Sequence, residues 1–525
     1  MPANDPWTIK IMKRAKYNYS FKSLTCIALL ALIGLTSACQ TEKKANKKPN
    51  IVYLFTDDLT YRAIHSLGNK QVKTPNIDQL ASSGAIFSHA YNMGSWSGAV
   101  CTASRSMLIS GMSVWRTNEH RKLWHKNDPQ ARDNTWPKLM EKAGYDTYMT
   151  GKWHVDIPAD SVFMKTKHIR HGMPADAYDH AKMANLYETE VKTGKKTFNE
   201  IMPNGYNRPL SRSDESWSAS DSSKGGFWEG GKHWSEVVTD DALGFIDEAS
   251  KKDKPFFMYL AFNAAHDPRQ APQAYLDMYP VDSIEIPESF QPDYPYHDEI
   301  GVGPRLRDEA LAPFPRTEFA IKTHLKEYYA IITHLDAQIG LIIDDLKAKG
   351  LMQNTYIILT ADHGLAVGRH GLLGKQNMYD HSMRPPLMMS GPAVKPGTVI
   401  DTDVYYQDLM ATALDLAGIE KPSFVAFNSL LPLLDDTQST SSYDGIYGCY
   451  LNLQRMIRKD GYKLIVYPKA NKVLLFDLNK DPEEMQNIAD KPENAALKAR
   501  LFNDLLELQK HYDDTLDLSG VKIQS

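Results

Sequence analysis

The segment PNIVYLFTDD, residues 49–58, joins a short apolar run to a polar cluster that ends in Asp57 and Asp58. An apolar run bounded in this way is typical of a buried strand whose carboxyl end carries functional groups. Alternating strands and helices are indicated from there to about residue 434, which is the pattern of a sheet covered on both faces. We therefore predict an α/β fold in which a large mixed sheet is flanked by helices on both faces.

Three later segments have the same arrangement, an apolar run followed by ionisable residues. In an open α/β sheet, sites lie outside the carboxyl ends of the strands, so we expect the clusters to share one crevice. The three are residues 145–149 before Lys152 and His154, residues 256–262 before His266, and residues 356–359 before Asp362 and His363.

The pentapeptide CTASR places Cys101 four residues before Arg105. On a helix, this spacing puts both side chains on one face. At a helix N-terminus they would lie beside free backbone N–H groups, which favour an anion. The alternative interpretation is a buried structural cysteine, which is what a lone free cysteine usually is.

The ionisable residues indicate a metal ion and an oxyanion. Three carboxylates are the ligand type that a hard divalent ion such as calcium prefers. Three cations are too many for one pocket unless its ligand is an oxyanion. Taken singly, adjacent aspartates are more often a turn or a helix cap, and a lone lysine is more often solvated. The carboxylates are Asp57, Asp58 and Asp362, and the cations are Arg105, Lys152 and Lys375.

An ordered series of motifs gives the chain a family resemblance. It resembles a type I sulfatase of the alkaline phosphatase superfamily, and among these the bacterial sulfatases that act on polysaccharides. Besides PNIVYLFTDD, the matching stretches are TPNIDQLASSGAIFSHAY (74–91), CTASRSMLISG (101–111), AGYDTYMTGKWH (143–154), LTADHG (359–364), HGLLGKQNMYDHSMRPPLMMSGP (370–392), GYKLIVYP (461–468) and LLFDLNKDPEEMQNIAD (474–490).

The resemblance implies a role for each matching residue. A sulfatase-maturating enzyme would oxidise Cys101 to formylglycine, whose hydrate is the nucleophile. One divalent metal would be bound beside it, with calcium favoured and zinc, iron or manganese the alternatives, because one ligand would be a histidine. Two positions depart from the usual pattern, with Ala103 in place of proline and His363 in place of asparagine. By resemblance, Arg105 holds the hydrate, Lys152 and His154 surround it, His266 faces the leaving group, Lys375 contacts the sulfate, and Asp57, Asp58, Cys101, Asp362 and His363 ligate the metal.

The expected substrate is a sulfated polysaccharide or its oligosaccharides, with a marine algal glycan such as ulvan or carrageenan favoured. A glycosaminoglycan or aryl sulfate is the alternative within the family. His381 and Arg384 follow Lys375 closely and are predicted to bind a uronate carboxylate or a hydroxyl of the substrate. Two other classes stay open, a phosphodiesterase or phosphonate hydrolase of the same superfamily and a non-catalytic glycan-binding lipoprotein.

The chain divides into an export segment and two folded parts. Residues 49–436 are predicted to form the catalytic domain, and residues 443–525 a smaller C-terminal α+β subdomain with an antiparallel sheet and a terminal helix. Residues 325–349 carry apolar residues three or four apart, which predicts a long scaffold helix. A formal charge of −4 over 525 residues, with no basic stripe, argues against nucleic acid as a partner.

Residues 1–38 read as a signal peptide, with basic residues before an apolar core that is too short to span a bilayer. LTSAC ends at Cys39 and resembles a bacterial lipoprotein signal, followed by a polar linker over residues 39–48. We expect a lipid on Cys39, and a membrane association only through it. Ordinary cleavage near Ala38 is the alternative. Either outcome predicts the bacterial cell envelope, as a periplasmic protein or an outer-membrane lipoprotein.

Overall fold

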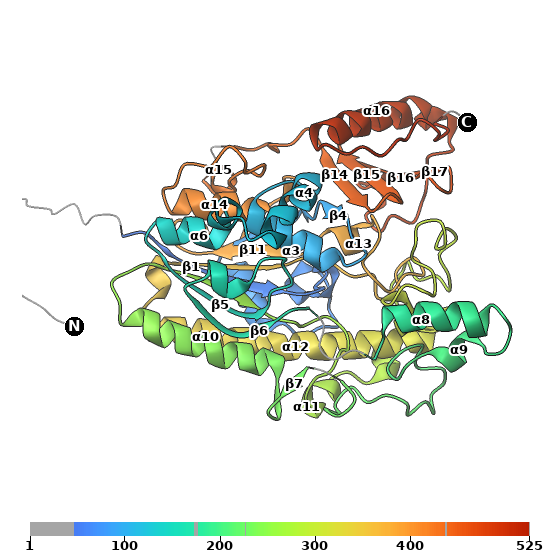
Figure 1. Ribbon diagram of the computed structural model, residues 1–525, viewed down its shortest axis with the longest axis horizontal. Helices are drawn as coiled ribbons and strands as arrows, with labels where there is room; N and C mark the ends of the chain where they lie inside the picture. Colours follow the sequence, from blue (N-terminus) through green and yellow to red (C-terminus); the bar gives the residue numbers. More distant parts are fainter. Residues whose placement is uncertain (1–46, 173–176, 226, 436–437, 524–525) are drawn as a thin grey trace, which may run out of the picture. The chain divides into compact units, whose positions relative to one another are not determined.

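The apolar run that opens the chain's folded part forms β1 (Asn50–Thr56), which lies inside an eight-stranded sheet in a computed structural model (Figure 1). All seven of its residues are buried, as expected of a strand that is covered on both faces. The model describes residues 47–172, 177–225, 227–435 and 438–523. The predicted signal peptide, Cys39 and most of the linker lie outside the described residues.

The sheet is mixed, as predicted. β1 pairs in parallel with β9 and β10, whereas β10 and β11 are antiparallel. In spatial order the strands are β12 (Thr398–Ile400), β2 (Ala85–Phe87), β11 (Leu387–Ser390), β10 (Thr355–Ala361), β1, β9 (Phe256–Ala261), β5 (Asp146–Lys152) and β6 (Lys165–Arg170).

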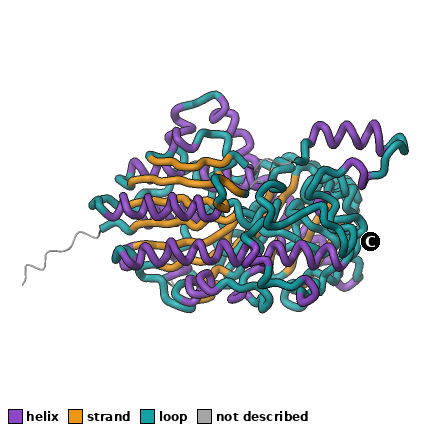
Figure 2. The backbone as a smooth tube through the Cα atoms, turned by 90° about the horizontal axis from the view of Figure 1, so that it is seen from below, coloured by secondary structure: helices purple, strands orange, loops and turns teal. Residues whose placement is uncertain are grey.

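Helices cover both faces of this sheet. Alternate residues of β1 point to opposite faces and enter two different apolar cores. Val52 and Leu54 pack in one core with the side chains of α10 (Trp234–Ser250) and α12 (Glu318–Ala348). Long helices run alongside the strands (Figure 2). Tyr53 packs in the other core, which is built on α3 (Val100–Ser110), α6 (Trp136–Lys142) and α14 (Asp408–Leu416). The predicted fold class is therefore confirmed.

The scaffold helix α12 begins earlier than the apolar periodicity indicates. Thr317 caps it, with its side chain accepting a hydrogen bond from the backbone N–H of Ala320. The extra N-terminal turns carry His324, whose ring is buried. The shorter elements are α2 (Pro75–Ser82), α4 (Val114–His125), α5 (Pro129–Asp133), α7 (Ala159–Val162), α8 (His180–Leu186), α9 (Phe198–Ile201), α11 (Gln273–Leu276), α13 (Asp380–Met383), α15 (Leu431–Leu434), β3 (Ala90–Tyr91), β7 (Trp228–Glu229), β8 (Lys232–His233) and β13 (Val404–Tyr405).

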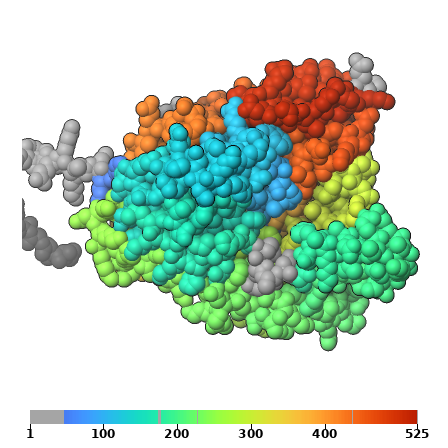
Figure 3. Space-filling view, in the orientation of Figure 1, coloured from blue at the N-terminus to red at the C-terminus, as the bar shows by residue number. Residues whose placement is uncertain are grey.

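The C-terminal part has the predicted antiparallel sheet and terminal helix. β14 (Ile446–Tyr450), β15 (Gln454–Lys459), β16 (Tyr462–Tyr467) and β17 (Lys472–Asp477) pair in sequence order, and the apolar face of α16 (Ala495–His511) packs in their core. This part lies against the segment that carries α3 and α4 (Figures 1 and 3). In the described part of the chain, no helix is both long and apolar enough to cross a membrane.

A fifth strand ties this sheet to the rest of the protein. β4 (Gly94–Ser95) pairs in parallel with β14, and α3 begins five residues after Ser95. Gly94 has a φ of 100°, and a Cβ there would lie 1.9 Å from the carbonyl oxygen of Cys449. Only glycine allows the two backbones to come this close.

We expect Gly94→Ala to lower the free energy of unfolding by about 3 kcal/mol, because it adds a backbone clash to a left-handed conformation. Gly98→Ala is the matched control, since its Cβ would have Tyr450 Oη at 3.8 Å as its nearest neighbour. Urea unfolding of both variants measures the difference. Equal stability of the two would show that the β4–β14 contact is not tight.

Candidate active site

Four neighbouring parallel strands bring the predicted residues to one edge of the sheet. The strands β10, β1, β9 and β5 are adjacent and point the same way, so the segments that follow them converge. Asp362 and His363 follow β10, Asp57 and Asp58 follow β1, His266 follows β9 by five residues, and Lys152 and His154 lie at the end of β5.

Four of these side chains and that of Cys101 form one buried cluster. The ligand atoms of Asp57, Asp58, Cys101, Asp362 and His363 all lie within 4.8 Å of one another. The Asp57 Oδ1 atom is buried and has no hydrogen-bond partner among the described residues. Since an unsatisfied buried carboxylate oxygen is costly, this donor set fits a divalent cation.

The imidazole of His363 is oriented so that its Nε2 could also bind a divalent cation. Its Nδ1 lies 2.9 Å from the carbonyl oxygen of Gly364, which can only accept, so Nδ1 carries the hydrogen. Its Nε2 is thereby turned toward Cys101 Sγ at 3.2 Å and Asp58 Oδ1 at 3.3 Å. A histidine held in this way by its second nitrogen is the usual arrangement of a metal ligand.

Each carboxylate of the cluster is paired with one cation. Lys152 Nζ forms an ion pair with Asp57. Lys375 Nζ donates to Asp58 Oδ2 at 2.8 Å and to Asp58 Oδ1 at 3.0 Å. The third pair joins Arg105 Nε to Asp362 Oδ2 at 3.0 Å. The three carboxylates and three cations balance, so a bound divalent cation would leave an excess of positive charge that suits an anionic substrate.

The two ends of the carboxylate cluster differ in their acidity. Burial opposes ionisation of Asp57, but the ammonium of Lys152 outweighs it and lowers the pKa of Asp57 to about 2. Burial and the charge of Asp57 together raise the pKa of Asp362 to about 7. Asp57 is therefore the firmly ionised member, whereas Asp362 needs nearby positive charge to stay ionised.

Cys101 occupies the first turn of α3, where the predicted helix N-terminus lies. Burial would raise the pKa of its thiol, but the positive charges of Lys152 and Lys375 bring it well below its usual range. Arg105, one turn later, donates from Nη1 to the carbonyl oxygen of Lys152 at 2.8 Å. Arg105 thus links Asp362 to the end of β5 through hydrogen bonds.

Two histidines flank the cluster with opposite proton affinities. Burial lowers the pKa of His154, and its Nδ1 has no hydrogen-bond partner in the described structure. Burial would also lower the pKa of His266, but the charges of Asp58 and Asp267 outweigh it and raise that pKa to about 10, although Lys375 Nζ lies 2.9 Å from Nε2. At neutral pH His154 is suited to accept a proton and His266 to donate one.

The structure adds a buried acidic residue that the sequence analysis missed. Asp308 Oδ2 lies 3.5 Å from Lys375 Nζ and accepts from Gln376 Nε2 at 2.7 Å. Burial opposes its ionisation, yet Lys375 and Arg307 lower the pKa of Asp308 to about 2. Asp308 follows no apolar run, so no sequence signal marked it. Asp267, which pairs with Arg307, directly follows His266, so the apolar run before His266 could have indicated it as well.

His381 and Arg384 lie in a different polar network. The His381 ring stacks on Tyr379 at 5.6 Å between centroids, and its Nδ1 is 2.8 Å from Ser382 Oγ. The Arg384 guanidinium lies over the ring of Tyr61 at 4.0 Å. Neither side chain has a contact with the carboxylate cluster in the described structure. We therefore assign neither residue a part in the reaction below.

Comparison with known proteins supplies the family. A family model described as Sulfatase matches residues 49–419. The chain belongs to the sulfatase family. The model described as N-sulphoglucosamine sulphohydrolase, C-terminal, matches residues 368–511. The predicted family is confirmed, and with it the predicted enzyme class, a sulfuric ester hydrolase.

Sulfatases from other organisms match nearly the whole chain. The N-acetylglucosamine-6-O-sulfatase of Bacteroides thetaiotaomicron is 25% identical over 93% of this chain and 91% of its own. The arylsulfatase of Clostridium perfringens is 29% identical over 85% of this chain and 91% of its own.

Solved structures share the fold. One that holds its substrate D-glucosamine-2-N,6-O-disulfate has a TM-score of 0.65 and 22% identity, over 90% of this chain and 99% of its own. A phosphonate monoester hydrolase from Silicibacter pomeroyi has a TM-score of 0.64 and 21% identity, over 89% of this chain and 96% of its own. The fold alone therefore does not separate sulfate from phosphonate esters.

Proposed function

We propose that this sulfatase hydrolyses sulfate esters of a sulfated saccharide, using a formylglycine made from Cys101 and one divalent cation, calcium. The observation that carries the proposal is the balanced set of three buried carboxylates and three buried cations around Cys101. When a divalent cation joins such a set, the excess positive charge attracts an anion, and a sulfate ester is an anion.

A carbohydrate substrate is supported by the names of the relatives. The Bacteroides thetaiotaomicron protein acts on N-acetylglucosamine 6-O-sulfate by its name, and the second family model is named for sulfoglucosamine. We therefore place a sulfated amino sugar of the glycosaminoglycan type first. A marine algal glycan is the second candidate, because a solved structure with a TM-score of 0.61 and 23% identity holds a neocarrahexaose.

The metal would be held by the carboxylates of Asp57, Asp58 and Asp362 and by His363 Nε2, with residue 101 facing it. Three carboxylates favour calcium over softer ions, since calcium prefers oxygen ligands. A cation bound there would draw charge from the sulfate oxygens and stabilise the charge that develops in the transition state. Lys152 and Lys375 both act on Cys101 through their positive charge and would hold and orient the same sulfate oxygens.

Position 101 would carry the nucleophile. A formylglycine hydrate there would supply two hydroxyls on one carbon, one to attack sulfur and the other to release inorganic sulfate as the aldehyde re-forms. The surrounding side chains then handle the protons. His266, protonated at neutral pH, would give its proton to the bridging oxygen as the alcohol leaves. His154, neutral at the same pH, would accept the proton of the second hydroxyl.

The conversion of Cys101 is the first test. Mass analysis of the tryptic peptides should show aldehyde in place of thiol at Cys101 when the host supplies a maturating enzyme. Cys449 is the internal control, because its buried thiol has a pKa of about 12, lies away from the cluster cations, and should stay unmodified. Cys101→Ala should abolish turnover without changing the melting temperature. An intact thiol in fully active protein would refute the proposed nucleophile.

Removing one cluster carboxylate tests the metal. Asp57→Asn and Asp362→Asn should each lose bound calcium and most activity, because each removes one charge from a ligand. Asp336→Asn is the matched control, since Asp336 is buried but bonds only to Asn76 and to the backbone of Ile77. Elemental analysis that finds wild-type calcium in the first two variants would contradict the assigned ligands.

The role of His266 is tested by the choice of leaving group. A sugar alkoxide needs a proton as it departs, whereas a nitrophenolate leaves without one. His266→Ala should therefore cut activity on a sulfated sugar by about 10²–10⁴-fold and on nitrophenyl sulfate far less. His334→Ala, at a buried histidine packed edge-to-face against His233, should affect both substrates alike. Equal losses in His266→Ala with a lowered melting temperature would make His266 a structural residue.

A further inference from the structure

A cavity of about 420 Å³ opens beside the loop that follows the proposed acid His266. Asp267 and Arg269 of that loop line it, together with Arg208 and Trp217 from the 204–225 segment and His324 of α12. The leaving group would lie next to His266, whose chain neighbour Asp267 lines this cavity.

Arg269 is the unusual residue of this cavity. Its side chain is buried, with 2% of the residue exposed. Its Nη1 lies 3.3 Å from His324 Nδ1, and its Nε has no hydrogen-bond partner. Among the described residues, no carboxylate lies within ion-pair distance of this guanidinium. Asp267 attracts this guanidinium from beyond ion-pair distance but is itself paired with Arg307, so the described residues leave much of the charge of Arg269 for a ligand to neutralise.

The other polar neighbours of Arg269 supply no free carboxylate. His324 Nε2 lies 2.9 Å from the carbonyl oxygen of Arg208, which can only accept, so Nε2 carries the hydrogen and Nδ1 accepts from Arg269. His324 is thus neutral, and burial holds its pKa well below the usual range. The carboxylate of Glu327 is taken by both nitrogens of Arg208, at 2.8 and 2.7 Å.

Trp217 is a second unsatisfied donor in the same cavity. Its indole Nε1 is buried without a hydrogen-bond partner in the described structure, and the ring packs under the Arg208 guanidinium at 4.9 Å. An aromatic face beside a free cation is suited to a sugar that carries an oxyanion.

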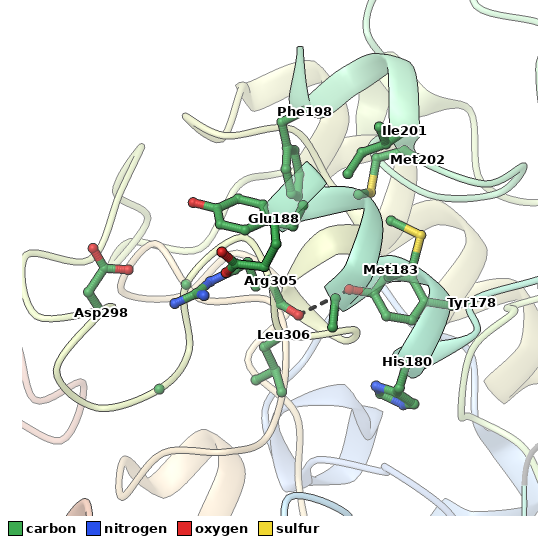
Figure 4. Close-up of a pocket in the computed structure, with 14 residues that line it drawn as sticks. Tyr178, His180, Met183, Glu188, Phe198, Ile201, Met202, Asp298, Arg305 and Leu306 are labelled. Atoms are coloured by element: carbon green, nitrogen blue, oxygen red, sulfur yellow. Dashed lines mark hydrogen bonds between the residues drawn. The ribbon is translucent and has the colours of Figure 1, made fainter. Parts of the chain in front are cut away.

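A neighbouring cavity of about 380 Å³ lacks these features (Figure 4). The two cavities meet where Tyr178 of this one packs on Tyr206 of the other, with ring centroids 4.9 Å apart. In Figure 4 the hydroxyl of Tyr178 donates to the carbonyl oxygen of Arg305, at 3.0 Å. Arg305 is exposed and stacks on Tyr187, so it needs no further counter-charge.

We propose that the cavity at Arg269 is a second anion subsite, which binds a sulfate or carboxylate group that the substrate carries in addition to the scissile sulfate. Arg269 and the Trp217 indole N–H donate to that group, and the enzyme thereby prefers saccharides with two anionic groups over those with one. This inference rests on the proposed function, because it assigns the leaving saccharide to the side of His266.

Binding measured without turnover tests the subsite by itself. Cys101→Ala protein loaded with calcium is titrated calorimetrically with D-glucosamine-2-N,6-O-disulfate and with the 2-N- and 6-O-monosulfates. The disulfate should bind about 10- to 100-fold more tightly than the better monosulfate, as a charge-assisted pair allows. In Cys101→Ala/Arg269→Met this preference should vanish, and in Cys101→Ala/Arg269→Lys part of it should remain. A 6-sulfated amino sugar linked to a uronate, compared with the same sugar linked to a neutral hexose, shows whether a carboxylate serves as well as a sulfate.

Arg212→Met is the matched control, since this exposed arginine of the same segment pairs with Asp282 and should leave the preference unchanged. The subsite is overturned if Cys101→Ala protein binds the disulfate no more tightly than the better monosulfate. It is also overturned if Cys101→Ala/Arg269→Met loses affinity for mono- and disulfate equally. Failure of the proposed function is separate: it would appear as absent hydrolysis of every sulfate ester by wild-type protein with formylglycine at position 101.

Discussion

The balance of buried charge at the carboxyl edge of the sheet constrains the rest of the structure. Asp57, Asp58 and Asp362 are fully buried, and each has at least one buried cation beside it. Removing one partner of such a pair typically costs about 3–5 kcal/mol, a large part of the 5–15 kcal/mol that stabilises an ordinary domain. Four strands must therefore end at the same level, and the helices behind them must hold the cations in place. Arg105 does so by bonding both Asp362 and the carbonyl oxygen of Lys152.

The C-terminal sheet serves the same site indirectly. β4 pairs with β14 and leads within five residues into α3, so the position of Cys101 depends on a strand pair shared with the C-terminal part. Gln376, next to Lys375, donates to Asp308 and also to the carbonyl oxygen of Gly98, which lies between β4 and α3. The proposed nucleophile position, the lysine proposed to bind sulfate and the C-terminal sheet are thus connected through short polar contacts rather than through one long element.

The sequence predicted the parts of the site that follow continuous apolar runs. β1 and β10 are buried on both faces, so their sequences are nearly all apolar and their polar ends stand out. It could not predict β4, because two residues carry no periodicity, nor Asp308, because no strand precedes it. His381 shows a further limit: it follows Lys375 by six residues, yet α13 turns its ring toward Tyr379. Local spacing does not reveal the direction of a side chain in so short a helix.

Two buried arginines in the enzyme illustrate how charge can be used in different ways. Arg105 has Asp362 at 3.0 Å and Asp57 at 3.6 Å, so its charge is neutralised by the protein and it acts on structure. Arg269 has a neutral imidazole at 3.3 Å and no carboxylate within ion-pair distance in the described structure, and Asp267, which it attracts, is already paired with Arg307, so its charge is available to a ligand. At the carboxylate cluster, the balance between acids and cations means that affinity for an anion must rise when a divalent cation binds. Since such coupling is reciprocal, a bound sulfate ester must also strengthen the hold on that cation. The subsite at Arg269 needs no such partner, and it would keep its anion affinity in protein stripped of metal.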